Sequence, residues 1–282
     1  MTVRAAAIQL CSGSDPEANA RMVTDLVRQA ADKGAQYIQT PEVTNLVTLD
    51  RSQSETLART EEDDFSLAAL RTVAADKGVT VHIGSLSIRD GDRLANRSFV
   101  IAPDGSIAAR YDKIHMFDVD LPDGETFRES QTFAPGRTAH LTPIGPLMLG
   151  LTICFDVRFA KLYAGLAEAG ATMFSVPAAF AVSTGEAHWH TLLKARAIEN
   201  GAFVVAAAQG GTHDCGRTTY GHSLIIDPWG RILAEGTDVP DIIMADLDPA
   251  MVETVRRQVP IMTARRTFSV VPAGTPQLRS AS

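Results

Sequence analysis

Residues 147–154 of the chain read LMLGLTIC, and this stretch decides the fold class. Its mostly apolar run, Leu147–Ile153, predicts a buried strand that ends at a thiol, Cys154. The pattern of Phe159–Ala169 predicts a helix capped by Gly170, and Ala171–Val176 predicts a second strand. Strand, helix and strand in this order indicate an α/β fold.

The rest of the second half continues the alternation. A helix predicted over Glu186–Glu199 precedes a strand predicted over Ala202–Ala208. The runs Ser223–Ile226 and Arg231–Ala234 flank the turn sequence Asp227-Pro228-Trp229-Gly230 and predict a hairpin. This half therefore has the order β-α-β-α-β-hairpin.

The first half repeats this order. Its predicted elements are the strand Arg4–Leu10, the helix Asp15–Lys33, the strand Gln36–Thr40, a helix over about Asp63–Lys77, the strand Val79–Ser85, and a hairpin of Ser98–Ala102 and Ser106–Tyr111. The repetition predicts an α/β fold of two similar halves, in which two sheets share one core and helices cover the outer faces. No linker separates the halves, so we expect a single domain over residues 1–272 and a flexible C-terminal tail over residues 273–282.

The composition limits the partners that the chain can bind. Of its 282 residues 45% are hydrophobic, enough for a sizeable core, and the net charge is −7. A negative charge without a cluster of Lys and Arg argues against nucleic acid and against an anionic membrane surface. No apolar run reaches the roughly 20 residues of a membrane span, and the sequence predicts no signal peptide. Its three cysteines form no disulfide or zinc pattern, so we expect a soluble, cytoplasmic protein.

Three reactive residues follow predicted strands, where open α/β sheets place their binding crevices. Cys154 lies between a strand and a helix, where a helix dipole favours the thiolate; otherwise it is a buried structural cysteine. Glu42 follows Pro41 at the end of a strand, and Lys113 leaves the first hairpin; each alone is ordinarily a solvated surface charge. Together they supply a nucleophile, a base and a cation, as covalent amide hydrolysis requires.

The sequences around these three residues resemble a known family. Thr40-Pro41-Glu42, Tyr111-Asp112-Lys113-Ile114-His115 and Gly150-Leu151-Thr152-Ile153-Cys154-Phe155-Asp156 are similar to the three catalytic motifs of the nitrilase superfamily of carbon–nitrogen hydrolases. The resemblance extends from Val3 to about Arg266. It implies a four-layer αββα sandwich, a homodimer or higher homo-oligomer, and catalysis without a metal or cofactor.

Further stretches resemble one branch of this superfamily, the deaminated glutathione amidases and ω-amidases. They are Met116-Phe117-Asp118-Val119-Asp120, Phe127-Arg128-Glu129-Ser130, Gly185-Glu186-Ala187-His188-Trp189, Lys194-Ala195-Arg196-Ala197-Ile198-Glu199 and Tyr220-Gly221-His222-Ser223. The resemblance implies that the enzyme hydrolyses the terminal amide of a small carboxylate-bearing substrate, such as deaminated glutathione or α-ketoglutaramate, to the acid and ammonia. It also makes Glu129 a second active-site acid.

A mechanism follows from these roles. Glu42 takes the proton of Cys154 as the sulfur attacks the amide, and burial together with the charge of Glu129 is expected to raise the pKa of this base. Lys113 and the backbone N–H of Phe155 hold the oxyanion. A thioester forms, and water hydrolyses it.

The substrate carboxylate has a candidate partner in Arg158. It lies four residues after Cys154, one helical turn along, and a bidentate guanidinium suits a carboxylate; otherwise it is an exposed surface arginine. The resemblance also implies substrate contacts at Phe180 and Thr184.

Other interpretations remain open. His188 and His190 suggest a metal site, but they point to opposite sides of a helix and no third ligand is near in sequence, so we expect none. A Cys–His dyad with His115 or His222 is a rival for the catalytic base. The chain is otherwise a catalytically silent scaffold, an acyltransferase, a nitrilase or an N-carbamoyl amino acid hydrolase.

Overall fold

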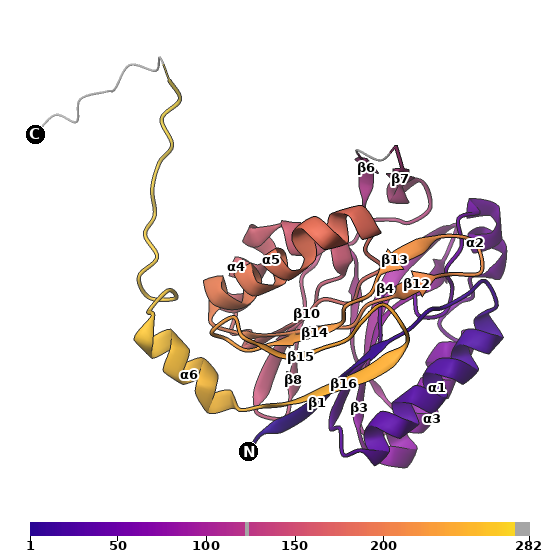
Figure 1. Cartoon of the computed structure of the whole chain (residues 1–282), viewed down its shortest axis with the longest axis horizontal. Helices are drawn as coiled ribbons and strands as arrows, with labels where there is room; N and C mark the ends of the chain where they lie inside the picture. Colours follow the sequence, from indigo (N-terminus) through magenta and orange to yellow (C-terminus); the bar gives the residue numbers. More distant parts are fainter. Residues whose placement is uncertain (122–123, 274–282) are drawn as a thin grey trace, which may run out of the picture.

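The computed structural model describes residues 1–121 and 124–273 (Figure 1). Its first sheet has six strands. In spatial order they are β16 (Asp241–Leu247), β1 (Val3–Gln9), β2 (Tyr37–Gln39), β3 (Thr80–Asp90), β4 (Arg93–Ile101) and β5 (Ile107–Asp112). The central strands β1, β2 and β3 are parallel, and β16, β4 and β5 join them in antiparallel pairs.

The second sheet has the same plan. In spatial order its strands are β15 (Ile232–Glu235), β14 (Leu224–Ile226), β11 (Phe203–Ala206), β10 (Met173–Ser175), β9 (Leu147–Gly150) and β8 (Leu141–Ile144). Here β9, β10 and β11 are parallel and the outer strands are antiparallel.

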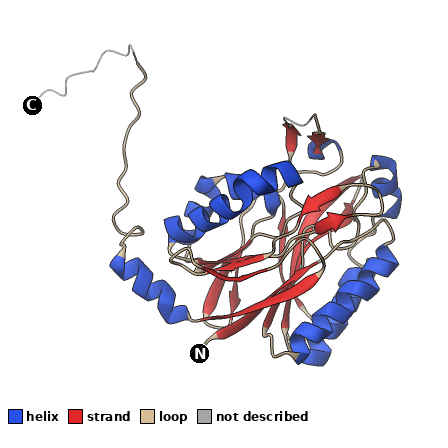
Figure 2. Ribbon diagram, viewed as in Figure 1, coloured by secondary structure: helices blue, strands red, loops and turns tan. Residues whose placement is uncertain are grey.

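Helices lie on the outer sides of the two sheets, as Figure 2 shows. The first sheet carries α1 (Pro16–Asp32) and α3 (Phe65–Lys77), and the second carries α4 (Ala160–Glu168) and α5 (Val182–Asn200). The remaining elements are α2 (Arg51–Leu57), α6 (Pro249–Gln258), the strands β6 (Asp118–Asp120), β7 (Thr126–Arg128), β12 (Gly210–Thr212) and β13 (Thr218–Tyr220), and the 3-10 turns η1 (Glu129–Gln131) and η2 (Cys154–Arg158). Among the described helices, none has the length and apolar character needed to cross a bilayer.

Alternation along β1 shows why the sheets stack. Successive side chains of a strand point to opposite faces. Ala5 and Ala7 belong to the core shared with the second sheet, whereas Ala6 and Ile8 belong to the core under α1 and α3. All four are fully buried. A stretch of strand buried on both faces must be apolar throughout, which is the pattern of residues 5–8.

The structure confirms the four-layer αββα sandwich and both predicted hairpins. The boundaries differ in places: β9 ends at Gly150, three residues earlier than predicted, and β3 extends to Asp90. A 3-10 turn begins at Cys154, and the helix predicted over Phe159–Ala169 follows it as α4. The sequence pattern did not predict the strand β16 and the helices α2 and α6, nor the short strands β6, β7, β8, β12 and β13. The predicted C-terminal tail lies, from residue 274 on, outside the described residues.

Candidate active site

Four predicted residues converge on one pocket of about 260 Å³. Glu42 follows β2, Lys113 follows β5, Glu129 begins η1 and Cys154 begins η2. All four line the pocket. The motifs, although up to 112 residues apart in sequence (154 − 42), therefore meet at the strand ends as the α/β pattern predicts.

The lysine lies between two carboxylates. Its Nζ is 2.8 Å from Glu42 Oε1 and 2.7 Å from Glu129 Oε2. The amide of Asn96 donates to both carboxylates, at 3.0 Å each. Lys113 is only 1% exposed, so its ammonium relies on these acids in place of water.

The carboxylate of Glu42 is fixed from both sides. Its Oε2 accepts a 2.9 Å hydrogen bond from the backbone N–H of Ala179, while Oε1 accepts from Lys113 and Asn96. The thiol of Cys154 lines the same pocket, and the charge of this carboxylate contributes to raising the pKa of the thiol. The acid is therefore placed in the pocket of the thiol, where a general base must lie.

The pKa values describe a resting proton arrangement. Burial and the Glu42 carboxylate raise the pKa of Cys154 well above its usual value, so the resting thiol is protonated. Burial alone would raise the pKa of Glu42, but the charge and hydrogen bond of Lys113 outweigh it and lower the pKa. The pKa of Lys113 is raised: burial opposes its charge, yet the charges of Glu129 and Glu42 prevail. The expectation that the pKa of Glu42 is raised is therefore wrong, because the ammonium contacts it directly.

Two residues of the pocket have an unusual backbone. Cys154 has φ 47° and Val43 has φ 46°, in the left-handed region that non-glycine residues rarely adopt. The N–H of Cys154 donates to Pro177 O at 2.8 Å. Gly84 lets these loops come close, because a Cβ there would lie 2.0 Å from Thr40 O. Strain of this kind is often found where a side chain must be held at a site.

A buried acid joins the segment of the lysine to that of the thiol. Asp156 Oδ1 accepts from His115 Nδ1 at 2.6 Å, and Oδ2 accepts from Tyr111 Oη at 2.7 Å and from Ile153 N at 2.9 Å. Asp156 is fully buried. The sequence marked it only as part of a motif, and the structure gives it a positioning contact.

Aromatic rings form the apolar wall of the pocket. The ring centre of Phe117 lies 5.1 Å from that of Phe127 and 5.1 Å from that of Phe155. Phe180 and Thr184 also line the pocket. The predicted contacts Phe155, Phe180 and Thr184 are thus all lining residues.

Two arginines lie near these rings. Arg217, which the sequence did not single out, lines the pocket, and its Nη2 donates to Ala179 O at 2.7 Å. Its buried Nε has no hydrogen-bond partner. The guanidinium carbon of Arg158 lies 5.7 Å from the ring centre of Phe155 and 5.3 Å from that of Phe180. Arg158 is not among the described lining residues.

The histidines proposed for a dyad lie elsewhere. Among the described residues that line the pocket there is no histidine. His115 binds Asp156 and stacks on Phe159 at 3.5 Å, while His222 contacts Glu235 at 3.3 Å. This geometry favours Glu42 over His115 or His222 as the partner of the thiol.

The architecture and the pocket define a hydrolase-like αββα sandwich, and comparison with known proteins identifies its class. Residues 4–257 match the carbon–nitrogen hydrolase family, and the chain belongs to this family. The fold superimposes on the crystal structure of NitFhit from Caenorhabditis elegans with a TM-score of 0.86 and 33% identity, covering 94% of this chain and 65% of that one. For Nit3 of Saccharomyces cerevisiae, a member of branch 10 of the nitrilase superfamily, the TM-score is 0.84 at 28% identity, with 94% and 97% covered.

Curated relatives narrow the class. The deaminated glutathione amidase of Yersinia enterocolitica is 38% identical over 271 residues, which cover 94% of this chain and 93% of the relative. An ω-amidase of Bos taurus is 33% identical over 266 residues, covering 94% and 96%. The chain is an amide-hydrolysing enzyme of the nitrilase superfamily.

Proposed function

We propose that this enzyme hydrolyses the ω-amide of a small carboxylate-bearing substrate through a thioester on Cys154. The observation that carries the proposal is the convergence of a thiol, two carboxylates and an ammonium on one pocket. The wall is aromatic and the reactive end is charged, so a short chain with a polar terminus fits it.

In the first step the sulfur attacks the amide carbon and its proton passes to Glu42. The lowered pKa of Glu42 keeps this acid ionised, and therefore able to accept a proton, in the resting enzyme. The ammonium of Lys113 and the backbone N–H of Phe155 stabilise the oxyanion, each worth roughly 3 kcal/mol. As negative charge develops on the oxyanion, Lys113 interacts with that charge as well, and it stabilises the ionised form of Glu42 less. The pKa of Glu42 then rises, which makes Glu42 a stronger base.

In the second step the tetrahedral intermediate collapses. Glu42 gives its proton to the leaving nitrogen, the C–N bond breaks, and the acyl group stays on sulfur. A water that gives a proton to Glu42 then attacks the thioester, which releases the acid and restores the thiol. We assign Glu129 the task of holding Lys113 in place, because it contacts Nζ through both oxygens at 2.7 and 2.9 Å.

The leaving group distinguishes the two substrates that the names of the relatives suggest. Hydrolysis of the γ-amide of deaminated glutathione releases the dipeptide cysteinylglycine, whereas α-ketoglutaramate releases ammonia. The release of ammonia expected from the sequence therefore applies to α-ketoglutaramate alone. Both substrates leave the same acyl group, 2-oxoglutarate, whose carboxylate needs a cationic partner. We propose Arg217 for this role because it lines the pocket, and we retain Arg158, which stacks on Phe155 and Phe180, as the second candidate.

The test is a substrate panel on the purified enzyme. Deaminated glutathione, α-ketoglutaramate, a nitrile and an N-carbamoyl amino acid are compared by kcat/KM, and 2-oxoglutarate, the dipeptide and ammonia are measured separately. We expect one or both of the first two compounds to be hydrolysed best. Preference for the nitrile or the carbamoyl compound would overturn the substrate class, and no hydrolysis of any compound would favour the silent scaffold.

Paired variants then assign the carboxylate contact. Arg217→Leu is expected to raise KM for α-ketoglutaramate about 10- to 100-fold, because a hydrogen bond to a charged group contributes about 1.5–3 kcal/mol. Arg158→Leu is the matched variant, and the lysine substitutions test whether charge alone suffices. A large change in KM for Arg158→Leu but none for Arg217→Leu would transfer the role to Arg158.

We also propose that the enzyme works in the cytoplasm as a homodimer or higher homo-oligomer. In support, the described C-terminal segment exposes Phe268 and Val270 at 85% and 80%, which a partner subunit could cover. Light scattering on the purified chain tests this, and a monomer at working concentration would contradict it.

A further inference from the structure

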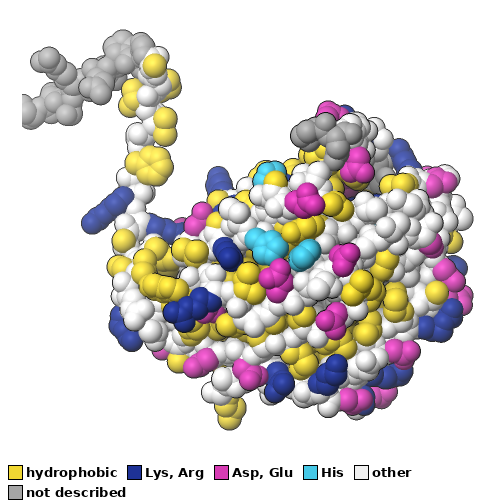
Figure 3. Space-filling model, in the orientation of Figure 1, with side chains coloured by type: hydrophobic (Ala, Val, Ile, Leu, Met, Phe, Trp, Pro, Cys, Tyr) yellow, Lys and Arg dark blue, Asp and Glu magenta, His cyan; other side chains and the backbone are white. Residues whose placement is uncertain are grey.

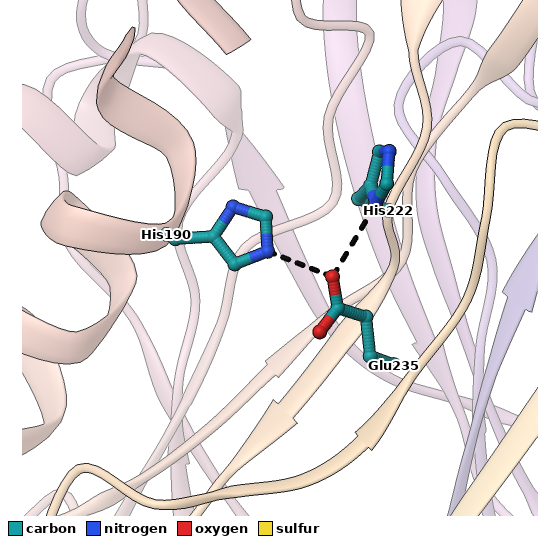
Figure 4. A group of neighbouring side chains, drawn as sticks. All are labelled: His190, His222 and Glu235. Carbon is teal, nitrogen blue, oxygen red and sulfur yellow. Dashed lines mark hydrogen bonds and ion pairs between the residues drawn. The ribbon is translucent and has the colours of Figure 1, made fainter. Parts of the chain in front are cut away.

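Three side chains from separate elements meet on the surface beside the second sheet. His190 is on α5, His222 follows β13, and Glu235 ends β15 (Figure 4). Both rings point toward the carboxylate. A group of histidines with acidic neighbours is visible on the corresponding face in Figure 3.

The ligand atoms are close enough to share one ion. His190 Nε2 is 2.8 Å and His222 Nδ1 is 3.3 Å from Glu235 Oε1, and one donor atom from each of the three lies within 4.8 Å of the others. Bonds of about 2.0–2.2 Å around a tetrahedral zinc ion would place its ligands roughly 3.3–3.6 Å apart. Only small movements would therefore bring the three donors around one ion.

We propose that His190, His222 and Glu235 form a binding site for a divalent transition-metal ion of the zinc type. Two imidazole nitrogens and one carboxylate are a ligand set that zinc accepts, with water in the open position. The side chains are 31%, 31% and 37% exposed, so an ion can reach them from solvent.

The backbone around the site holds these ligands in place. His222 has φ 53° and is one of three non-glycine residues with positive φ among those described; the other two, Val43 and Cys154, line the active-site pocket. The indole of Trp189 donates to His222 O at 2.8 Å, which ties this strained residue to α5. The ring of Tyr220 stacks on that of His222 at 4.5 Å. Ligands held in advance by other contacts bind an ion with a smaller loss of entropy.

The site also lies one residue away from the substrate pocket. Trp189, next to His190, packs on Phe180 with ring centres 4.9 Å apart, and Phe180 lines the pocket. The N–H of Tyr220 donates to Phe180 O at 2.9 Å. An ion that joins α5 to the segment after β13 would therefore fasten the two elements that support this wall of the pocket.

The alternative is a surface network in which Glu235 accepts hydrogen bonds from two imidazoles. Burial would raise the pKa of Glu235, but the hydrogen bonds from His190 and His222 outweigh it and lower the pKa. Such a network accounts for the contacts without an ion, so only binding separates the two explanations.

The test is titration of the purified full-length enzyme with Co²⁺ and Zn²⁺. Cobalt is followed by its visible absorption, which reports ligand type and geometry, and zinc by calorimetry. We expect one ion per chain and no sulfur-to-cobalt charge-transfer band, because the site holds no cysteine. Affinity should fall in acid, because protons compete with a metal ion for its nitrogen and oxygen ligands.

Substitutions at the three proposed ligands test where the ion binds. His190→Ala, His222→Ala and Glu235→Gln should each raise the Kd at least tenfold, about the lower limit for loss of a supporting group in metal sites. His188→Ala is the matched control: this residue lies two positions earlier on α5 and contacts Arg158 at 3.3 Å, and its loss should leave the Kd unchanged. Circular dichroism checks that each variant is folded.

Three results would overturn the proposal. One is the absence of stoichiometric binding, and another is a charge-transfer band, which would place cobalt on a thiol such as Cys154. The third is a Kd that responds equally to His188→Ala and His190→Ala. The metal titration does not measure substrate hydrolysis. A negative titration would therefore not contradict the proposed amidase mechanism, and a failure of the amidase assays would not contradict the proposed metal site.

Discussion

The molecule contains two charged clusters that are built alike and differ in burial. Each gathers an acid and basic or polar partners from separate segments, and each includes a residue with positive φ, Cys154 in one and His222 in the other. The side chain of Lys113 is 2% exposed, whereas that of Glu235 is 37% exposed. Water therefore solvates one cluster and is excluded from the other.

This difference decides how much each charge is worth. An exposed ion pair contributes about 0–1 kcal/mol, because water and salt compete with it. In a buried cluster the removal of one partner costs about 3–5 kcal/mol, since the remaining charge is left without solvent. The same low dielectric strengthens the field that acts on a reacting carbonyl, so we expect the chemistry at Cys154 and not at Glu235.

The largest expected effect is that of Cys154→Ala, which removes the proposed nucleophile from the buried cluster. Without the sulfur no thioester can form, and kcat should fall by about 10⁴-fold or more, as for other nucleophiles. Mass spectrometry of enzyme trapped with substrate should find no acyl adduct. Cys215→Ala, at a partly exposed cysteine, is the control and should retain the adduct. Residual activity near that of the unmodified enzyme would exclude Cys154 as the nucleophile.

The second largest expected effect on kcat is that of Glu42→Gln. The amide keeps the shape of the side chain but cannot take the thiol proton, so kcat should fall by about 10²- to 10⁴-fold. Burst kinetics with a good leaving group would locate the loss in acylation. If His115→Ala abolished the acyl adduct and Glu42→Gln did not, the dyad would be correct instead.

The lowered pKa of Glu42 also predicts a pH effect on stability. A carboxyl whose pKa is lowered by folding stabilises the native state above its unfolded pKa, near 4.3, and this contribution is lost as the pH falls through the folded value. Glu42→Gln should therefore weaken the decline in unfolding free energy below about pH 4. Urea unfolding at several pH values measures it.

Lys113→Met should have an intermediate effect on activity and a large one on stability. It leaves Glu42 and Glu129 buried together without a cation, which we expect to cost about 3–5 kcal/mol of unfolding free energy at pH 7. The loss should shrink in acid, because bound protons can then neutralise the buried charge that the missing cation leaves uncompensated. Loss of one oxyanion donor should lower kcat by about 10²- to 10³-fold. Lys161→Met, on the exposed side of α4, is the control.

The sequence could predict one cluster and not the other, for a physical reason. Glu42 and Cys154 each follow an apolar strand, and parallel strands end at one edge of a sheet, so local pattern and sheet geometry together bring them near each other. His190, His222 and Glu235 are separated by 32 and 13 residues (222 − 190 and 235 − 222), and nothing in their local sequence fixes which faces meet. Their contact depends on how α5 packs on the sheet.

The same reasoning explains the other omissions. Asn96 is in the middle of β4, where alternation places it on the pocket side, but a polar residue within a strand gives no sign of that role. Arg217 lies in the turn between β12 and β13, two strands too short to be predicted. The strand β16 was missed because Asp241 and Asp246 leave only a short apolar run between them; it gains stability from pairing with β1, which is remote in sequence.

The smallest expected effect on the unfolding free energy is in the exposed cluster of His190, His222 and Glu235. In metal-free buffer Glu235→Gln should change the unfolding free energy by less than about 1 kcal/mol, and the coupling with His190→Ala in a double-mutant cycle should be about 0.2–1 kcal/mol and fall in high salt. Because the pKa of Glu235 is lowered, what stability it adds is present above about pH 4.3 and is lost below its folded pKa. A coupling of several kcal/mol without metal would mean that exposure does not separate the two clusters. A small coupling that grows on addition of Zn²⁺ would instead mean that an ion strengthens the interaction among these three exposed residues. Burial strengthens the interaction between Lys113 and its two acids in the same sense.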